Sequence, residues 1–213
     1  MEPAPHSLPQ PAENLEIPLS ALTPPLDWPA LFGRGGPNAL EIGTGNGLFL
    51  AAEAARRPEM NFIGIERDPG FYWKMVKRCA REGRTNVRTT RGDALELLRD
   101  WLPAESLARI YCYFSDPWPK RRHAERRVVN AALLPLLERV LAPGGEFWFK
   151  TDVGYYFNLA VTDFREREGW RFTELGRAPS ADPARGEAIS NFERKAHEAG
   201  SLIWGFHARR NSE

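Results

Sequence analysis

The glycine-rich stretch at residues 39–50, ALEIGTGNGLFL, decides the fold. An apolar run with a single acid, Glu41, leads into Gly43, Gly45 and Gly47, and helical periodicity follows. Glycine lets the backbone turn sharply and approach a ligand closely. The stretch therefore predicts a buried strand, a tight loop and a helix, which together form the first βα unit of a parallel sheet.

The same alternation of apolar runs and helical periodicity continues along the chain. Strands are expected at residues 39–42, 62–65, 86–90, 110–114, 146–149, 171–174 and 202–208. Helices are expected at residues 48–57, 69–82, 94–101, 126–141, 155–168 and 192–198. This order predicts an α/β fold: a doubly wound, mostly parallel seven-stranded sheet with helices on both faces and an antiparallel edge strand near the C-terminus. The run from Pro143 to Gly145 is expected to stop the helix before the fifth strand.

Composition and charge are those of a soluble globular domain. The chain has 213 residues, of which 42% are hydrophobic and 27% are charged. Eight of the 18 prolines fall in residues 1–29. Residues 1–27 therefore predict an extended, partly ordered arm, followed by one domain at residues 28–213. The net charge is only +1, so a nucleic-acid partner would require a local basic patch.

Several other classes of protein are disfavoured. No apolar segment reaches the roughly 18 residues that a membrane span needs, and no secretory signal is apparent, so we expect a cytoplasmic protein without a membrane partner. The two cysteines form no CxxC and the four histidines form no HExxH, so no metal site is expected. A hydrolase would be expected to carry a GxSxG motif, which does not occur.

Three acidic residues accompany the first three expected strands: Glu41, Glu66 and Asp93. The glycine loop has Leu48 where a dinucleotide site has its third glycine, which counts against NAD. S-adenosylmethionine lacks phosphates and carries a cationic sulfonium, so acids suit it. Glu41 would pair with its amino group, Glu66 with its ribose hydroxyls and Asp93 with its adenine amino group. Alternatively, Asp93 caps the next helix, with Glu96 at the third helical position.

The stretch at residues 111–127, YCYFSDPWPKRRHAERR, brings an acid, a stiff turn and cations together. Asp116 ends the fourth strand, at the expected mouth of the ligand crevice. Pro117 and Pro119 restrict the backbone on both sides of Trp118, and Pro119 favours an extended Trp118. A planar base could pack there while Asp116 accepts the N1 and N2 protons of guanine. The alternative is that Trp118 only packs and Asp116 only caps.

Two groups of cations predict local basic surfaces. The first carries one acid, Glu125, among Lys120, Arg121, Arg122, Arg126 and Arg127. The second has the spacing of one helix face and comprises Lys74, Lys77, Arg78 and Arg81, extended by Arg84, Arg88 and Arg91. Both groups suit RNA phosphates. For the second group, a merely solvated helix face explains the pattern equally well.

Taken in order, the motifs LEIGTGNG, GIE, GDA, SDPWPK followed by RHxxRR, FKTD and NFE resemble those of the bacterial tRNA (guanine-N7-)-methyltransferases. The likeness runs from about residue 28 to residue 204. It implies the class I methyltransferase fold, S-adenosyl-L-methionine as cofactor and tRNA as partner. The expected product is 7-methylguanosine in the tRNA variable loop, made by a monomer or a homodimer.

The resemblance also implies roles for individual residues. Cofactor contacts are implied for Glu41, Gly43, Gly45, Glu66, Asp93, Ala94 and Asp116. Substrate contacts are implied for Lys120, Arg122, His123, Arg126, Arg127, Asp152, Ser190, Asn191, Phe192 and Glu193. Glu125 and Asn191 stand where the family commonly has lysine, so each replaces a positive contact to RNA.

Asp116 is the expected catalytic residue, and the chemistry indicates its role. Guanine N7 is a lone-pair acceptor that can attack a methyl group without first losing a proton. Asp116 is therefore expected to position the base rather than to act as a general base. Two other functions stay open: an amino-group methyltransferase, whose acid-Pro-Pro-aromatic turn is similar to DPWP, and a non-catalytic RNA-binding module. The intact set of Glu41, Glu66 and Asp93 argues against the second.

Overall fold

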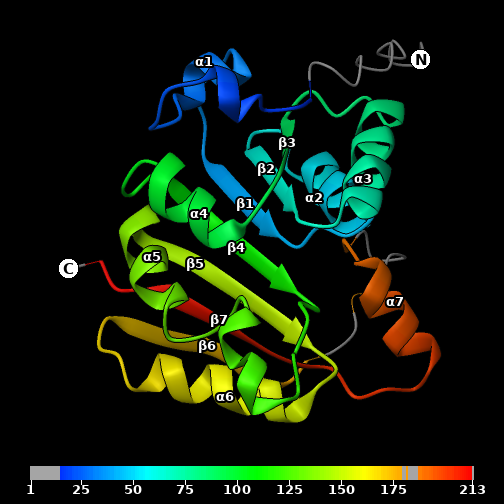
Figure 1. The fold of residues 1–213 in the computed structure, drawn as a ribbon, viewed down its shortest axis with the longest axis vertical. Helices are drawn as coiled ribbons and strands as arrows, with labels where there is room; N and C mark the ends of the chain where they lie inside the picture. Colours follow the sequence, from blue (N-terminus) through cyan, green and yellow to red (C-terminus); the bar gives the residue numbers. More distant parts are fainter. Residues whose placement is uncertain (1–14, 179–180, 182–186, 213) are drawn as a thin grey trace, which may run out of the picture.

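One seven-stranded sheet runs through the molecule (Figure 1). The computed structural model describes residues 15–178, 181 and 187–212. The strands are β1 (Asn38–Ile42), β2 (Asn61–Glu66), β3 (Val87–Arg91), β4 (Leu107–Tyr113), β5 (Leu141–Thr151), β6 (Trp170–Arg177) and β7 (Trp204–Arg210). Their order is β3-β2-β1-β4-β5-β7-β6, and β1 to β5 are parallel. This confirms the predicted doubly wound, mostly parallel sheet.

The antiparallel pairs of the sheet involve its C-terminal strands, as the sequence predicts. β7 pairs antiparallel with both of its neighbours, through Phe149↔Phe206 to β5 and Phe172↔Ala208 to β6. The antiparallel strand therefore lies one place inside the edge, and β6 forms the edge itself. Because β5 and β6 are both antiparallel to β7, they run in the same direction. Both therefore end at the carboxyl edge of the sheet, where the glycine loop lies.

Helices cover both faces of the sheet (Figure 1). The α-helices are α1 (Trp28–Phe32), α2 (Leu48–Arg56), α3 (Pro69–Arg81), α4 (Ala94–Glu96), α5 (Leu133–Val140), α6 (Gly154–Arg165) and α7 (Asn191–Glu198). Two 3-10 helices, η2 (Leu19–Ala21) and η4 (Arg121–Arg126), and one π-helix, η3 (Leu97–Trp101), accompany them. α2 and α3 pack around Phe62 and Met75, whereas α5 and α6 pack around Phe147. Two apolar layers thus enclose the sheet and hold its carboxyl edge in place.

The helix predicted at residues 126–141 is wrong in its first half. The 3-10 helix η4 ends where that helix should begin, and α5 starts only after a non-helical stretch. Asn130 turns the chain there, because its side chain donates to the Arg127 carbonyl at 2.6 Å and accepts from the Ala132 amide at 2.8 Å. Such local side-chain bonds compete with helix formation. α5 then ends just before the stop expected at Pro143.

Part of the predicted N-terminal arm packs on the domain. Leu15 is fully buried, and the Thr89 amide donates to its carbonyl at 2.6 Å. The Ile17 amide in turn donates to the Thr89 carbonyl at 2.8 Å, so the arm extends the edge of β3. Residues 1–14 lie outside the described residues. The domain boundary at residue 28 therefore stays a prediction, although the order in the arm begins at least as early as Leu15.

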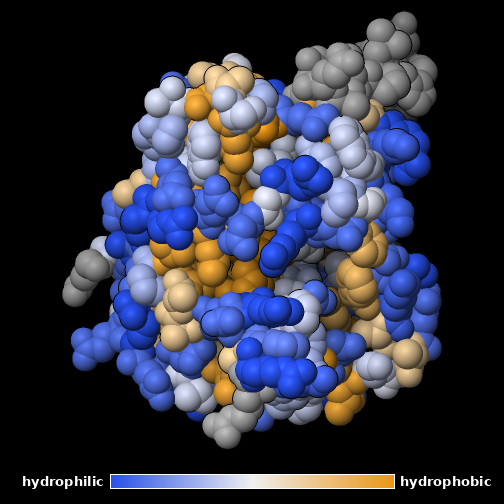
Figure 2. Space-filling view, in the orientation of Figure 1, coloured by the Kyte–Doolittle hydropathy of each residue, from blue (hydrophilic) through white to orange (hydrophobic). Residues whose placement is uncertain are grey.

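The surface is mainly hydrophilic on the face shown in Figure 2, where apolar residues gather in a hollow near the middle. In the part of the chain that the structure describes, no helix is both long and apolar enough to cross a membrane.

Candidate active site

A cavity of about 830 Å³ opens at the carboxyl ends of β1, β2 and β4. This volume is that of a typical small-ligand pocket. The wall includes most of the residues for which cofactor contacts are predicted: Gly43, Gly45, Glu66, Asp93, Ala94 and Asp116. Predicted substrate residues Arg126, Arg127 and Phe192 also line it. The topology therefore brings residues from both predicted sets to one crevice, where ligands bind in open α/β sheets.

The glycine loop has the backbone shape that its sequence predicts. Gly43, Gly45 and Gly47 all have left-handed φ angles, of +73°, +55° and +72°. A Cβ at Gly47 would lie 2.9 Å from the Met75 side chain, so glycine is required there for close helix packing. A Cβ at Gly43 would meet nothing within 4 Å. Because Gly43 lines the cavity, a side chain at this position would project into the ligand space.

Glu66 fixes the loop from the end of β2. One carboxylate oxygen accepts from the Gly45 amide at 2.7 Å. The other accepts from the amides of Arg67 at 2.8 Å and Asp68 at 2.9 Å. Each carboxylate oxygen carries two lone pairs, so the Gly45-bound oxygen can accept one more donor. Glu66 therefore has a fixed orientation in the cavity wall.

Glu41 lies deeper than the cavity wall and is only 2% exposed. Burial raises the pKa of its carboxyl well above the usual value, and the nearby carboxylates of Glu66 and Glu53 raise it further. Its Oε2 has no hydrogen-bond partner among the described residues. A buried polar atom without a partner is costly. A ligand group that donates a hydrogen bond or carries a positive charge would therefore suit the Glu41 carboxyl.

Asp93 serves as the N-cap of α4, as one of the two sequence interpretations predicts. Its Oδ1 accepts from the Leu95 amide at 2.9 Å and from the Glu96 amide at 3.3 Å. This cap is confirmed. Asp93 is nevertheless exposed and lines the cavity beside Ala94, so capping does not withdraw its carboxylate from a ligand.

The DPWP turn is stiff, but its backbone differs from the expected shape. Trp118 was expected to be extended because it precedes Pro119, and this is wrong: its φ is +40°, and that of Phe114 is +54°. Such angles are uncommon outside glycine and cluster at functional sites. The Arg127 guanidinium holds the turn, donating to the carbonyls of Pro117 at 2.8 Å and Trp118 at 2.9 Å. The interactions of Arg127 thus supply the rigidity that the prolines alone would not.

The indole of Trp118 forms the aromatic surface of this turn. The Arg126 guanidinium lies 5.1 Å from its ring, and the His123 ring meets it edge-on at 5.6 Å. Asp116 is exposed beside it and lines the cavity. An acid, an indole and two guanidinium groups therefore surround one end of the cavity.

Other predicted substrate residues lie outside the cavity wall. Lys120, Arg122 and Asp152 are exposed, the first two around η4 and the third directly after β5. Asn191 begins α7, where Ser190 caps the helix by accepting from the Glu193 amide at 2.9 Å. None of these five residues lines the cavity.

Phe192 and Glu193 point to different sides of α7. Phe192 lies over the glycine loop, with its ring 3.4 Å from where a Cβ on Gly45 would be, and 6.3 Å from the Phe71 ring. Glu193 is fully buried, and its Oε1 accepts from Lys150 Nζ at 2.8 Å and the Ala181 amide at 2.9 Å. Glu193 thus anchors α7, and Phe192 covers the cavity.

Comparison with known proteins places the chain in a family. A family model described as putative methyltransferase matches residues 36–206. A tRNA (guanine-N(7)-)-methyltransferase of Nocardia farcinica is 39% identical over 193 residues, covering 85% of this chain and 70% of the relative. A protein of the same name from Syntrophotalea carbinolica is 36% identical over 193 residues, covering 91% and 82%. The chain belongs to the tRNA (guanine-N7)-methyltransferase family.

Solved structures agree with this assignment at the level of the fold. The 16S rRNA methyltransferase KamB superposes with a TM-score of 0.62 at 14% identity, covering 85% of this chain and 91% of that one. A mutant 16S rRNA (adenine(1408)-N(1))-methyltransferase from Catenulisporales acidiphilia, solved with its cosubstrate SAM, gives 0.60 at 17% identity, covering 87% and 92%. The fold is that of the class I methyltransferases, as the sequence predicts.

Lys150 is a residue of this methyltransferase that sequence reasoning missed. Its ammonium pairs with the buried Glu193 and lies 5.3 Å from the Tyr113 ring. Its carbonyl accepts from the Phe114 amide at 2.7 Å, directly before the DPWP turn. Lys150 therefore connects the turn to α7. The only sign of Lys150 in the sequence is its place in the FKTD motif. Its partner Glu193 lies 43 residues away, so no local pattern connects the two.

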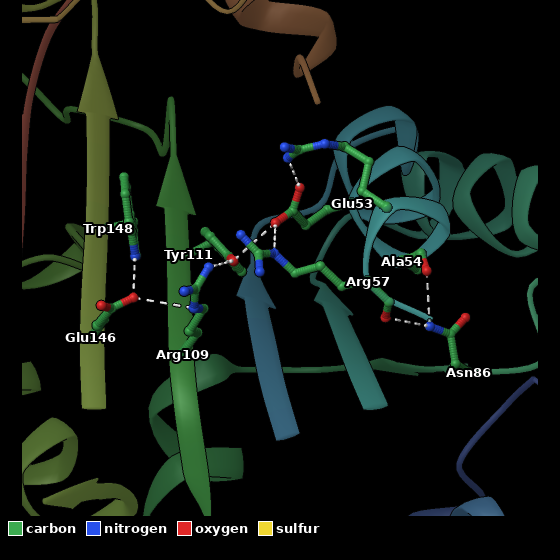
Figure 3. Close-up of polar contacts among 9 residues, drawn as sticks. Glu53, Ala54, Arg57, Asn86, Arg109, Tyr111, Glu146 and Trp148 are labelled. Carbon is green, nitrogen blue, oxygen red and sulfur yellow. Dashed lines mark hydrogen bonds and ion pairs between the residues drawn. The ribbon is translucent and has the colours of Figure 1, made fainter. Parts of the chain in front are cut away.

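A second cavity of this methyltransferase, of about 730 Å³, lies over β4, β5 and β7 beside α2. Figure 3 shows polar contacts around it, including those of Glu53, Arg57, Arg109 and Tyr111 in its wall. Glu53 accepts from Arg57 at 2.5 Å and from the Tyr111 hydroxyl at 3.3 Å. Arg109 pairs with Glu146 at 3.1 Å. These bonds connect α2 to β4 and β4 to β5.

Proposed function

We propose that this chain transfers a methyl group from S-adenosyl-L-methionine to N7 of a guanine in the tRNA variable loop, giving 7-methylguanosine. The proposal rests on one observation: Glu66, Asp93 and Asp116 line the same cavity. Membership of the tRNA (guanine-N7)-methyltransferase family supports the acceptor. Because tRNA is the proposed substrate, we expect the protein to act in the cytoplasm. Its oligomeric state, monomer or homodimer, stays a prediction.

The residues of the cavity fit S-adenosyl-L-methionine. Gly43 leaves open space where a side chain would project, and the nearby charges at Glu66 and Asp93 are negative. Acids suit the hydroxyl and amino donors and the sulfonium of this cofactor. Glu66 would hold the ribose hydroxyls and Asp93 the adenine amino group, with Glu41 behind the loop as partner for the ammonium. When bound, this cofactor supplies an electrophilic methyl group.

Asp116 and Trp118 would bind the acceptor base. The Asp116 carboxylate would accept the N1 and N2 protons of guanine, while the indole packs on its plane. N7 needs no deprotonation before attack, so the chain's task is to aim the lone pair. Orientation of this kind can lower a barrier by about 7–11 kcal/mol. Asp116 then also stabilises the positive charge that the base gains.

Cations around the turn would hold the rest of the RNA. Arg126 and Arg127 line the cavity and are fixed by contacts to the turn itself. Lys120 directly precedes η4, and Arg122 and His123 lie on it, where phosphates would reach them. Asp152, Ser190 and Asn191 stay predicted contacts at the rim. Glu193, being buried, would act on RNA through the position of α7.

Substitution of the acceptor atom tests this proposal. We would prepare one tRNA transcript with guanosine and one with 7-deazaguanosine, in which a carbon replaces N7. Transfer of labelled methyl to the first and none to the second is the expected result. Equal methylation of both transcripts would show that the acceptor is a different atom, and would favour an amino-group methyltransferase.

A further inference from the structure

The exposed face of α3 combines a tryptophan with three cations. Trp73 is 48% exposed, which is unusual for so large an apolar side chain. Lys74, Lys77 and Arg81 are exposed on the same helix. Trp73, Lys77 and Arg81 follow one another at four-residue spacing, and Lys74 lies three residues before Lys77, so the four side chains lie on one side of the helix. α3 itself contains no acidic residue.

The structure divides the basic stripe that the sequence predicts at residues 74–91. Arg78 points inward and donates to the Asn46 carbonyl at 3.1 Å. Arg88 donates to the Leu31 carbonyl at 3.0 Å and lies over an aromatic ring. Arg84 pairs with Glu82 at 3.2 Å. These three guanidinium groups therefore serve the fold and are not available to a partner.

The remaining cations of α3 keep their charge available at the surface. Lys74 Nζ lies 5.0 Å from the Phe71 ring, which fixes its direction without neutralising it. Arg81 is 3.8 Å from Glu82 and its side chain is 71% exposed, so this ion pair is weak. In the described residues, Lys77 has no ion pair. Trp73, Lys74, Lys77 and Arg81 are called the α3 face below.

The α3 face begins at the mouth of the cavity. Asp68 and Phe71, at the start of the helix, line the cavity, and so does Arg126 on η4. At 1.5 Å per residue, α3 carries Arg81 about 15 Å beyond Phe71. The cavity therefore lies between two basic surfaces, η4 and the α3 face. A chain of phosphates that delivers a base to the cavity can contact both.

We propose that the α3 face binds the RNA strand next to the methylated guanine, with Trp73 stacking on an unpaired base and the three cations on backbone phosphates. This inference rests on the proposed function, because it takes tRNA as the substrate. Aromatic platforms combined with cations are how proteins hold single-stranded RNA. A solvated helix face would explain the cations but not the exposed indole.

Binding of unmodified tRNA transcript by single variants tests the α3 face. We expect Trp73→Ala to raise the Kd for tRNA roughly 5- to 100-fold. Lys74→Ala and Lys77→Ala should each lower the slope of log K against log salt by about 0.7–0.9. The matched control is Arg165→Ala, which removes an exposed arginine from the last turn of α6, on the other face of the sheet.

The outcomes separate this inference from the proposed function. Calorimetric titration of each variant with S-adenosylmethionine checks that the fold is intact. If Trp73→Ala and the lysine variants bind tRNA with the same Kd and salt slope as Arg165→Ala, the α3 face does not contact RNA. Product analysis of the wild-type protein is independent: if it forms no 7-methylguanosine, the proposed function is wrong even where the α3 face binds tRNA.

Discussion

At the scale of single residues, Glu66 shows how backbone donors complete a site. The sequence places Glu66 at the end of the second strand, and strand periodicity is enough for that. It does not reveal that the amides of Gly45, Arg67 and Asp68 all donate to this carboxylate. Those donors come from a loop and a turn whose shapes depend on the folded sheet. The candidate could thus be predicted, but its orientation could not.

Glu66→Gln should weaken cofactor binding. The amide side chain loses the charge that strengthens three backbone hydrogen bonds and one expected ribose contact, and hydrogen bonds to charged groups contribute about 1.5–3 kcal/mol. We expect the Kd for S-adenosylmethionine, measured by calorimetry, to rise roughly 10- to 100-fold. Glu59→Gln, at an exposed site before β2, is the control and should bind normally. Equal affinities of the two variants would exclude Glu66 from the cofactor site.

Lys150→Met should destabilise the protein, because it leaves Glu193 buried without its cation. Breaking a buried ion pair costs about 3–5 kcal/mol. We expect a loss of that size in the free energy of unfolding, measured with urea. The double variant Lys150→Met with Glu193→Leu should recover most of it, since no buried charge then remains. A double variant as unstable as the single one would show that the pair is not the cause.

At the scale of elements, local sequence patterns locate α7 well but fail in the segment before α5. The sequence predicts a helix at residues 192–198, and α7 begins one residue earlier, at Asn191, where Ser190 caps it. The helix expected at residues 126–141 fails in its first half because Asn130 bonds to its own neighbours. Apolar periodicity continues through that segment, so pattern alone cannot locate the break.

Ser190→Ala should loosen α7 and its cover over the glycine loop. An N-cap serine contributes about 1 kcal/mol. We expect a loss of stability of that order, and a raised KM for S-adenosylmethionine, because Phe192 depends on α7 for its position. Thermal unfolding and initial rates would measure the two effects. Ser190→Asp, which can still cap, should restore both, and a variant that restores neither would contradict the capping role.

At the scale of the whole molecule, charges far apart in sequence meet across the sheet. Glu146 on β5 lies beside Arg109 on β4 and His207 on β7. The strand order was predictable as a class from alternating helices and strands. The insertion of β7 between β5 and β6 was not, because antiparallel pairing over tens of residues depends on the whole sheet.

The pH dependence of stability should reveal Glu146. The His207 imidazole, 3.5 Å away, together with Arg109 lowers the pKa of the Glu146 carboxyl from 4.5 to about 2. Its contribution to stability is therefore full above pH 4.5 and is lost as the pH falls toward 2. The difference in free energy of unfolding between wild type and Glu146→Gln should shrink over that interval. Glu96→Gln controls for net charge, and an identical pH profile for both variants would contradict the assignment.

The most direct test of the account is the identity of the methylated nucleoside. Purified protein would be incubated with labelled S-adenosylmethionine and unmodified tRNA, and the digested nucleosides would be identified by mass spectrometry, with Asp116→Ala alongside. We predict 7-methylguanosine with the wild type and its loss with the variant. Another methylated nucleoside, or full 7-methylguanosine formation by Asp116→Ala, would contradict the role given to the cavity and its turn.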